Sequence, residues 1–144
     1  MEKLLIQKIQ DLKNKNLFRV QKGDWDEGYI NFTSNDYLGL AKHPEVVAAS
    51  IEAAEKYGVG ATASRIAGGN HPLYDELEAK LSKAKGYEAA CVFGSGYLAN
   101  IGVITSLVGE GDLIIADKLS HNSLLEGAKH SGAKLVRFKH NCMK

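Results

Sequence analysis

A glycine turn between an apolar run and a helix-compatible segment is the feature of this sequence best suited to chemistry. Residues 88–100 read EAACVFGSGYLAN, in which Gly94, Ser95 and Gly96 follow the β-prone run 89–93. A strand that turns on glycines into a helix brings free backbone N–H groups and the positive end of the helix dipole to one place. The pattern therefore predicts a binding site for a phosphate group.

Two side chains are placed to contact whatever binds at this turn. Tyr97 begins the predicted helix directly after the glycines, and His121 stands at the corresponding point one strand–helix unit later. In a parallel sheet both positions lie at the carboxyl ends of strands, where ligands of doubly wound proteins bind. A histidine near a helix start is also a common capping or surface group, so both interpretations of His121 stay open.

The same turn fits a dinucleotide-binding fingerprint. Gly94, Gly96 and Ala99 supply G-x-G-x-x-A, and Asp117 follows the next strand, where an acid would bind a ribose. Nucleotide-binding units usually begin near the start of their domain, whereas this one lies well inside the chain. A small nucleotide-binding module is a second hypothesis, and a turn that needs glycine only for its backbone angles is a third.

Composition describes an ordinary globular protein. The 144 residues are 44% apolar and 24% charged, with a formal net charge of +1, which gives no reason to expect a nucleic-acid partner or a membrane surface. The five histidines show no metal-ligand spacing with cysteines or acids. Cys91 and Cys142 are too few for a disulfide framework, and Cys91 is expected to be buried. No signal peptide or membrane span is recognisable, so we expect a cytoplasmic protein.

Hydrophobic periodicity and turn residues predict the elements that position these groups. After residue 88 they alternate as strand, helix, strand, helix, strand, which predicts an α/β fold with a parallel sheet and flanking helices. Three strands leave an exposed sheet edge, so this looks like part of a larger domain. The predicted helices span 3–15, 44–57, 72–85, 96–107 and 120–131, and the predicted strands span 29–33, 89–93, 113–116 and 133–138.

Two local features accompany these elements. Ser123 and Glu126 form a capping-box pattern at the start of the last predicted helix. The glycine-rich stretch 58–69 contains apolar residues and the lone Arg65. Because that texture is unlike a Gly/Ser spacer, we expect an ordered loop in which Arg65 bonds loop carbonyls.

Taken together, several stretches resemble the α-oxoamine synthases, which are pyridoxal 5′-phosphate (PLP) enzymes of the aspartate aminotransferase fold type I. Within that family they are most similar to the biotin-pathway branch, the 8-amino-7-oxononanoate synthases. 5-Aminolevulinate synthase, 2-amino-3-ketobutyrate CoA ligase and serine palmitoyltransferase remain alternatives. The resembling stretches are NFTSNDYLGLAKHPEV (31–46), GVGATASRIAGGNHPLYDELE (58–78), FGSGYLANIGVI (93–104) and DKLSHNSLLEGAKHSGAKLVRFKHN (117–141).

The resemblance implies a decarboxylative condensation of an amino acid with an acyl-CoA or acyl-carrier-protein thioester. In the biotin branch these substrates are L-alanine and a pimeloyl thioester, PLP is the electron sink, and the full-length enzymes are homodimers. Gly96 and Tyr97 match positions around the cofactor phosphate, and His121 matches a histidine stacked on the pyridine ring. Asn35 matches an asparagine near the substrate carboxylate, and Arg19 an arginine that contacts the acyl substrate.

The resemblance also implies a division of the chain. Residues 1–33 form an N-terminal helix and short strand, and residues 34–144 form the first part of the PLP-binding large domain. Asp117 becomes a strand-end residue. In the family the Schiff-base lysine, the aspartate paired with the pyridine nitrogen and the small C-terminal domain come later than Lys144. We therefore expect a truncated chain that is inactive alone, or one that folds only against a complementary chain.

Overall fold

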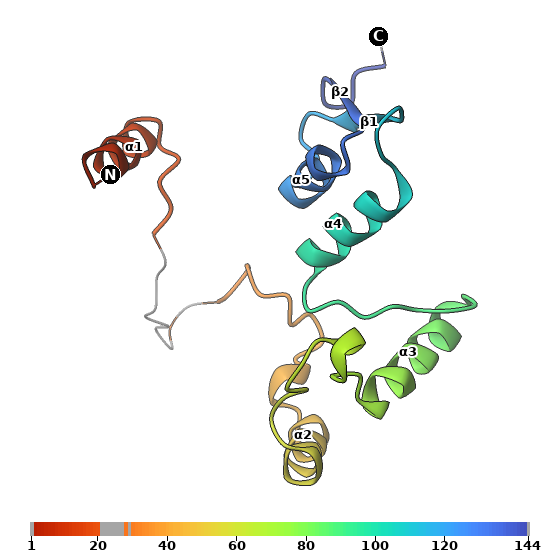
Figure 1. Cartoon of the computed structure of the whole chain (residues 1–144). Helices are drawn as coiled ribbons and strands as arrows, with labels where there is room; N and C mark the ends of the chain where they lie inside the picture. The colour runs from red at the N-terminus through yellow and green to blue at the C-terminus, as the bar shows by residue number, and fades with distance from the viewer. Residues whose placement is uncertain (1, 21–27, 29, 144) are drawn as a thin grey trace. The chain divides into compact units, whose positions relative to one another are not determined.

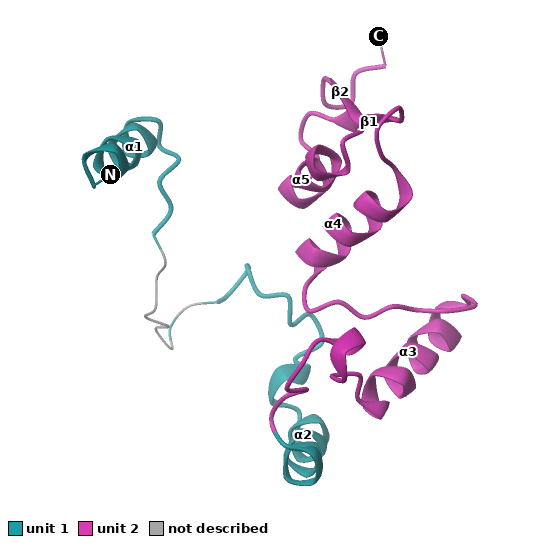
Figure 2. Ribbon diagram, in the orientation of Figure 1, with its two compact units in different colours: residues 1–58 teal, residues 59–144 magenta. Residues whose placement is uncertain are grey.

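Two compact units make up the computed structural model of the chain (Figures 1 and 2), which describes residues 2–20, 28 and 30–143. The first unit spans residues 1–58 and the second spans residues 59–144. Among the described residues, no helix is both long and apolar enough to cross a membrane.

The first unit contains the helices α1 (Glu2–Asn14) and α2 (Pro44–Tyr57), with the 3-10 helix η1 (Leu40–Lys42) before α2. Both predicted helices are confirmed. Pro44 occupies the first turn of α2, where its missing N–H costs no hydrogen bond. Gly58, with a φ of 83°, ends this helix in a conformation that favours glycine.

The prediction of a strand at 29–33 is wrong for residues 30–33, which form no strand, and residue 29 lies outside the described residues. The chain forms a turn there, in which Asn31 Oδ1 accepts hydrogen bonds from the Thr33 N–H at 3.0 Å and from Thr33 Oγ1 at 2.8 Å. A side-chain acceptor that satisfies the backbone two residues on competes directly with a strand ladder.

The second unit contains the parallel strand–helix–strand motif that the sequence predicts. Strands β1 and β2 pair in parallel, from Leu113 opposite Lys134 to Asp117 opposite Phe138. Each predicted helix and these two strands are confirmed to within two residues at either end. The elements are η2 (Arg65–Ala67), α3 (Pro72–Lys85), α4 (Gly96–Leu107), β1 (Leu113–Asp117), α5 (Asn122–Ser131) and β2 (Lys134–Phe138).

The strand predicted at 89–93 is not formed, so the sheet among the described residues has two strands. A strand needs a backbone partner at its edge, but the Val92 N–H donates instead to the Glu78 carboxylate of α3 at 2.8 Å. Cys91 in the same segment is exposed, so its predicted burial is also wrong.

The most closely packed part of the second unit is the interface of α4 with α5. Asn100 of α4 contacts Ser123 of α5, and one turn further on Ile104 lies against Gly127. Since both residue numbers rise together, the two helices run in the same direction. Ser123 is not exposed at all, and Gly127 is buried as well. The helices therefore have their N-termini at the same end.

This close approach predicts the effect of adding a side chain at Gly127. A Cβ there would lie 3.0 Å from Ile104 Cδ1 and 3.2 Å from the Asn100 carbonyl oxygen. We expect Gly127→Val to lower the free energy of unfolding by about 1–3 kcal/mol, as overpacking does, measured by chemical denaturation. Gly109→Val is the matched control, since a Cβ there meets only Ser131 O at 3.9 Å. Equal effects of the two variants would contradict the packing described.

Candidate functional site

The N-terminus of α4 presents two unused backbone donors. Ser95 caps the helix, accepting the Leu98 N–H on its Oγ at 3.2 Å and the Ala99 N–H on its carbonyl oxygen at 3.0 Å. The Gly96 and Tyr97 N–H groups have no hydrogen-bond partner within the described part of the chain. Two free N–H groups at the positive end of a helix dipole form an anion-binding site.

The glycines of this turn keep the donors accessible. Neither Gly94 nor Gly96 has a φ in the left-handed region, so neither is required by its backbone angles. The interpretation that glycine serves only the turn geometry is therefore wrong. A Cβ at Gly96 would meet no atom within 4 Å, so the space beside the amide is open to an incoming group. A phosphate fits this arrangement because nothing of the described chain occupies that space.

His121 is the N-cap of α5. Its Nδ1 accepts the Ser123 N–H at 3.2 Å and lies 2.7 Å from Ser123 Oγ. The Asn100 Nδ2 group donates to the same Oγ at 2.8 Å. Because α4 and α5 run in the same direction and meet at Asn100 and Ser123, His121 lies at the same end of the pair as Gly96 and Tyr97. The structure thus places these three predicted residues at the same end of the helix pair.

The predicted capping box at the start of α5 is wrong. Ser123 is the second residue of the helix, and its hydroxyl is engaged by Asn100, while His121 supplies the cap. Glu126 pairs with Lys129 at 2.6 Å, and this pairing lowers the pKa of the Glu126 carboxyl. The Ser123 hydroxyl is thus engaged by a residue of α4, and the capping-box pattern within α5 could not predict this contact.

The two predicted substrate-binding residues lie in the first unit. Arg19 is exposed in the segment that follows α1, and Asn35 is exposed in the loop before η1. The Tyr37 hydroxyl donates to Asn35 Oδ1 at 3.5 Å, a long contact. Asp36 shapes this loop, since its Oδ1 accepts the Leu40 N–H at 2.8 Å.

Asp117, the ribose-binding acid of the nucleotide hypothesis, is committed to the strand ends. Its Oδ1 accepts the Leu119 N–H at 2.6 Å, its Oδ2 accepts the Asn141 N–H at 3.3 Å, and both oxygens lie 3.1 Å from His140 Nδ1. The bond from Leu119, and then that from His140, lowers the pKa of the carboxyl. With its acceptors used inside the protein, Asp117 is a strand-end residue, which weighs against the nucleotide-binding module.

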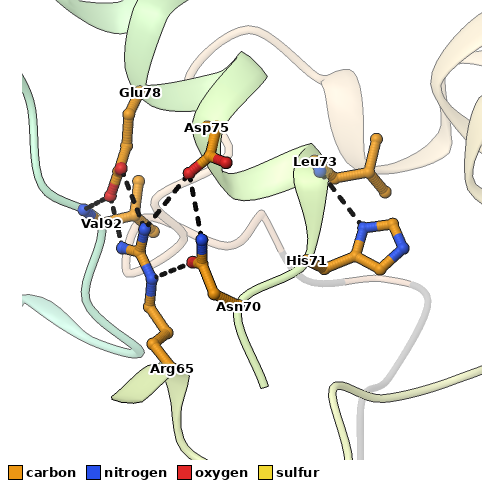
Figure 3. A network of polar contacts seen from close by, with 7 residues as sticks. All are labelled: Arg65, Asn70, His71, Leu73, Asp75, Glu78 and Val92. Atoms are coloured by element: carbon orange, nitrogen blue, oxygen red, sulfur yellow. Dashed lines mark hydrogen bonds and ion pairs between the residues drawn. The ribbon is translucent and has the colours of Figure 1, made fainter. Parts of the chain in front are cut away.

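Arg65 orders the glycine-rich loop (Figure 3). Its NH1 and NH2 groups bind the two Glu78 oxygens at 2.5 and 3.0 Å, and its Nε donates to Asn70 Oδ1 at 2.7 Å. The guanidinium lies over the Tyr74 ring at 4.8 Å. The ordered loop is thus confirmed, although Arg65 binds the side chains of Asn70 and Glu78 where backbone carbonyls are predicted.

The Glu78 carboxylate accepts hydrogen bonds both from Arg65 and from the backbone of the segment before Gly94. Besides Arg65, it binds the Val92 N–H at 2.8 Å, so one carboxylate holds the loop and the segment leading to Gly94. The Arg65 hydrogen bonds, followed by the Val92 bond, lower the pKa of Glu78 to about 2.

Sequence reasoning missed Asn100 and Glu78. Asn100 is the one amide side chain on a mostly apolar helix, GYLANIGVITSL, and a lone amide on such a helix signals a specific polar partner. Glu78 carries no comparable signal, because it is one of several acids on α3. Among the described residues, no group of histidines, cysteines and acids could hold a metal ion.

Comparisons with a family model, with curated sequences and with solved structures all match this chain to related proteins. The family model of aminotransferase class I and II matches residues 27–144. An 8-amino-7-oxononanoate synthase from Methylobacterium nodulans is 53% identical over 115 residues, covering 80% of this chain and 30% of that protein. The chain therefore spans about 30% of the length of such curated relatives.

Two solved structures share the fold at appreciable identity. A serine palmitoyltransferase from S. paucimobilis with a bound PLP–myriocin aldimine superposes with a TM-score of 0.77 at 31% identity, covering 96% of this chain and 39% of that chain. The 8-amino-7-oxononanoate synthase from Francisella tularensis gives a TM-score of 0.66 at 34% identity, covering 80% of this chain and 32% of that one.

The depressed pKa of Glu78 predicts a pH-dependent contact. A carboxyl with a folded pKa of about 2 against the usual 4.5 stabilises the fold above pH 4.5, and this contribution is lost as the pH falls through about 2. We expect the Val92 amide resonance to titrate with a midpoint near 2 in ¹⁵N NMR, and Glu78→Gln to abolish this titration. Glu76→Gln on the same helix is the control; a Val92 titration that survives Glu78→Gln would refute the assignment.

Proposed function

The chain belongs to the aminotransferase class I and II family, and we propose that it supplies the phosphate-binding part of an 8-amino-7-oxononanoate synthase. Its relatives at about 50% identity carry that name. The single structural observation that supports the proposal is the pair of free N–H groups, Gly96 and Tyr97, at the open N-terminus of α4.

The proposed reaction of the whole enzyme is the decarboxylative condensation of L-alanine with a pimeloyl thioester, carried by CoA or an acyl-carrier protein. It is a step of biotin biosynthesis in the cytoplasm, carried out by a homodimer. When bound, PLP supplies an electron sink that stabilises a carbanion. The protein's task is to hold that cofactor and to orient the substrates against it.

Five residues of this chain have a proposed part in that task. The Gly96 and Tyr97 N–H groups donate to the cofactor phosphate, assisted by the dipole of α4. The His121 ring lies against the pyridine ring and excludes water from one face of it. Asn35 binds the substrate carboxylate, and Arg19 binds the acyl substrate.

The domain organisation follows from the same proposal. Residues 1–33, which include α1, precede residues 34–144, and the latter form the first part of a type I PLP-binding large domain. The parallel pair β1–β2 and the helices α4 and α5 are the portion of that domain that forms the phosphate end of the site.

A serine palmitoyltransferase-like activity is the second candidate. The structural likeness to the S. paucimobilis enzyme, at a TM-score of 0.77, favours it. Both candidates use the same α4 and α5 residues toward the cofactor, and they differ in the amino acid and acyl chain that bind. The higher identity to the 8-amino-7-oxononanoate synthases favours the first candidate.

The phosphate role of α4 is tested with Gly96→Ala. The open space beside Gly96 means that the fold tolerates the methyl group, whereas the phosphate would meet it. The ligand is pyridoxamine 5′-phosphate, which has no aldehyde to react with surface lysines. We expect Gly96→Ala to raise its Kd at least about tenfold, or about 1.4 kcal/mol, in a ¹⁵N-detected titration.

The control variant is Gly60→Ala, at another glycine where a Cβ meets nothing within 4 Å. Pyridoxamine, which lacks the phosphate, is the ligand control and is expected to leave the Gly96 and Tyr97 amide shifts unchanged. Binding that shifts neither amide, or that Gly96→Ala leaves intact, would contradict the proposed site.

A further inference from the structure

A directional chain of hydrogen bonds runs from α4 to the His121 ring. We propose that Asn100 and Ser123 are positioning residues that hold His121 as the neutral tautomer with its proton on Nε2. The three side chains meet at the α4–α5 contact, where Ser123 is buried and His121 is exposed, with Asn100 Nδ2 2.8 Å from Ser123 Oγ and His121 Nδ1 2.7 Å from that oxygen. The role of His121 beside a cofactor rests on the proposed function, whereas the hydrogen bonds among Asn100, Ser123 and His121 do not depend on it.

The backbone donor at Ser123 indicates the direction of the chain. The Ser123 N–H lies 3.2 Å from His121 Nδ1, and a backbone N–H can only donate. Nδ1 therefore presents its lone pair to the start of α5. In a neutral imidazole one nitrogen accepts and the other carries the proton, so the proton of His121 is on Nε2.

The Ser123 hydroxyl agrees with this direction only if Asn100 donates to it. Ser123 is not exposed at all, so no solvent substitutes for a lost partner. With the Asn100 amide donating to Oγ, the hydroxyl hydrogen is free to point at Nδ1. The opposite amide orientation would turn that hydrogen toward Asn100 and leave two lone pairs facing each other at Nδ1.

The consequence is an oriented ring with one defined donor. Two donors to Nδ1 hold the His121 ring at the N-terminus of α5, and its remaining N–H, on Nε2, points away from Ser123. In the proposed enzyme the ring beside the cofactor is therefore fixed in orientation by residues that do not touch the cofactor. Asn100 acts through Ser123, and Ser123 acts on His121 directly.

The first test needs no substitution. Long-range ¹H–¹⁵N correlation spectra of the full chain, without cofactor and at a pH where histidine is neutral, report which His121 nitrogen is protonated. We expect the pattern of the Nε2–H tautomer. A His121 with its proton on Nδ1, or with both tautomers equally populated, would overturn the proposal.

Two variants then separate positioning from packing. Asn100→Asp replaces the donor by an acceptor, so the Ser123 hydrogen turns away from His121, only the Ser123 N–H still donates to Nδ1, and the Nδ1–H fraction rises severalfold. Asn100→Ala removes the donor without supplying an acceptor, so the hydroxyl is no longer directed and the Nδ1–H fraction rises less than in the Asp variant. Asn14→Asp on the exposed face of α1 is the matched control. Equal tautomer populations in the Asp and Ala variants would mean a packing role only, and would overturn the proposal.

These readouts do not depend on cofactor binding. If pyridoxamine 5′-phosphate fails to bind while His121 keeps the Nε2–H tautomer, the proposed function fails and the positioning inference stands. If pyridoxamine 5′-phosphate binds and His121 has its proton on Nδ1, the proposed function stands and the positioning inference fails.

Discussion

The contact between Asn100 and Ser123 is the interaction on which the candidate site depends. It joins α4 to α5 at a point where the Ser123 side chain does not reach solvent. One turn further along, Gly127 has no side chain, which lets the two helices approach closely. Two parallel helices locked in this register bring both N-termini to one end. The free amides of Gly96 and Tyr97 and the His121 N-cap then lie at the same end of the helix pair.

A second polar network controls how the chain reaches that site. Glu78 receives two hydrogen bonds from Arg65 and one from the Val92 N–H, so it ties the glycine-rich loop and the segment before Gly94 to α3 (Figure 3). Exposed ion pairs contribute little to stability, but a bidentate pair that also binds backbone has a defined geometry. Its function here is to fix the path of the chain rather than to contact a ligand.

The sequence predicts the parts of this structure that are decided locally. Pro44 and Gly86 mark a helix start and a helix end, and the glycine turn starts α4 at the predicted residue. The predictions fail where a distant group takes over a local one. The Val92 N–H bonds to Glu78 where a strand is predicted, and Ser123 meets Asn100 where a capping box is predicted. The roles of Arg19 and Asn35 rest on resemblance, because their surroundings do not define a site.

A nuclear Overhauser measurement between His121 and the bound cofactor analogue is the most direct test of a common site at the N-termini of α4 and α5. With pyridoxamine 5′-phosphate added to the full chain, we expect cross-peaks from the His121 ring protons to the pyridine ring protons. These should occur together with perturbation of the Gly96 and Tyr97 amides. A bound analogue that perturbs those amides but gives no cross-peak to the His121 ring would contradict a single site at the common end of α4 and α5.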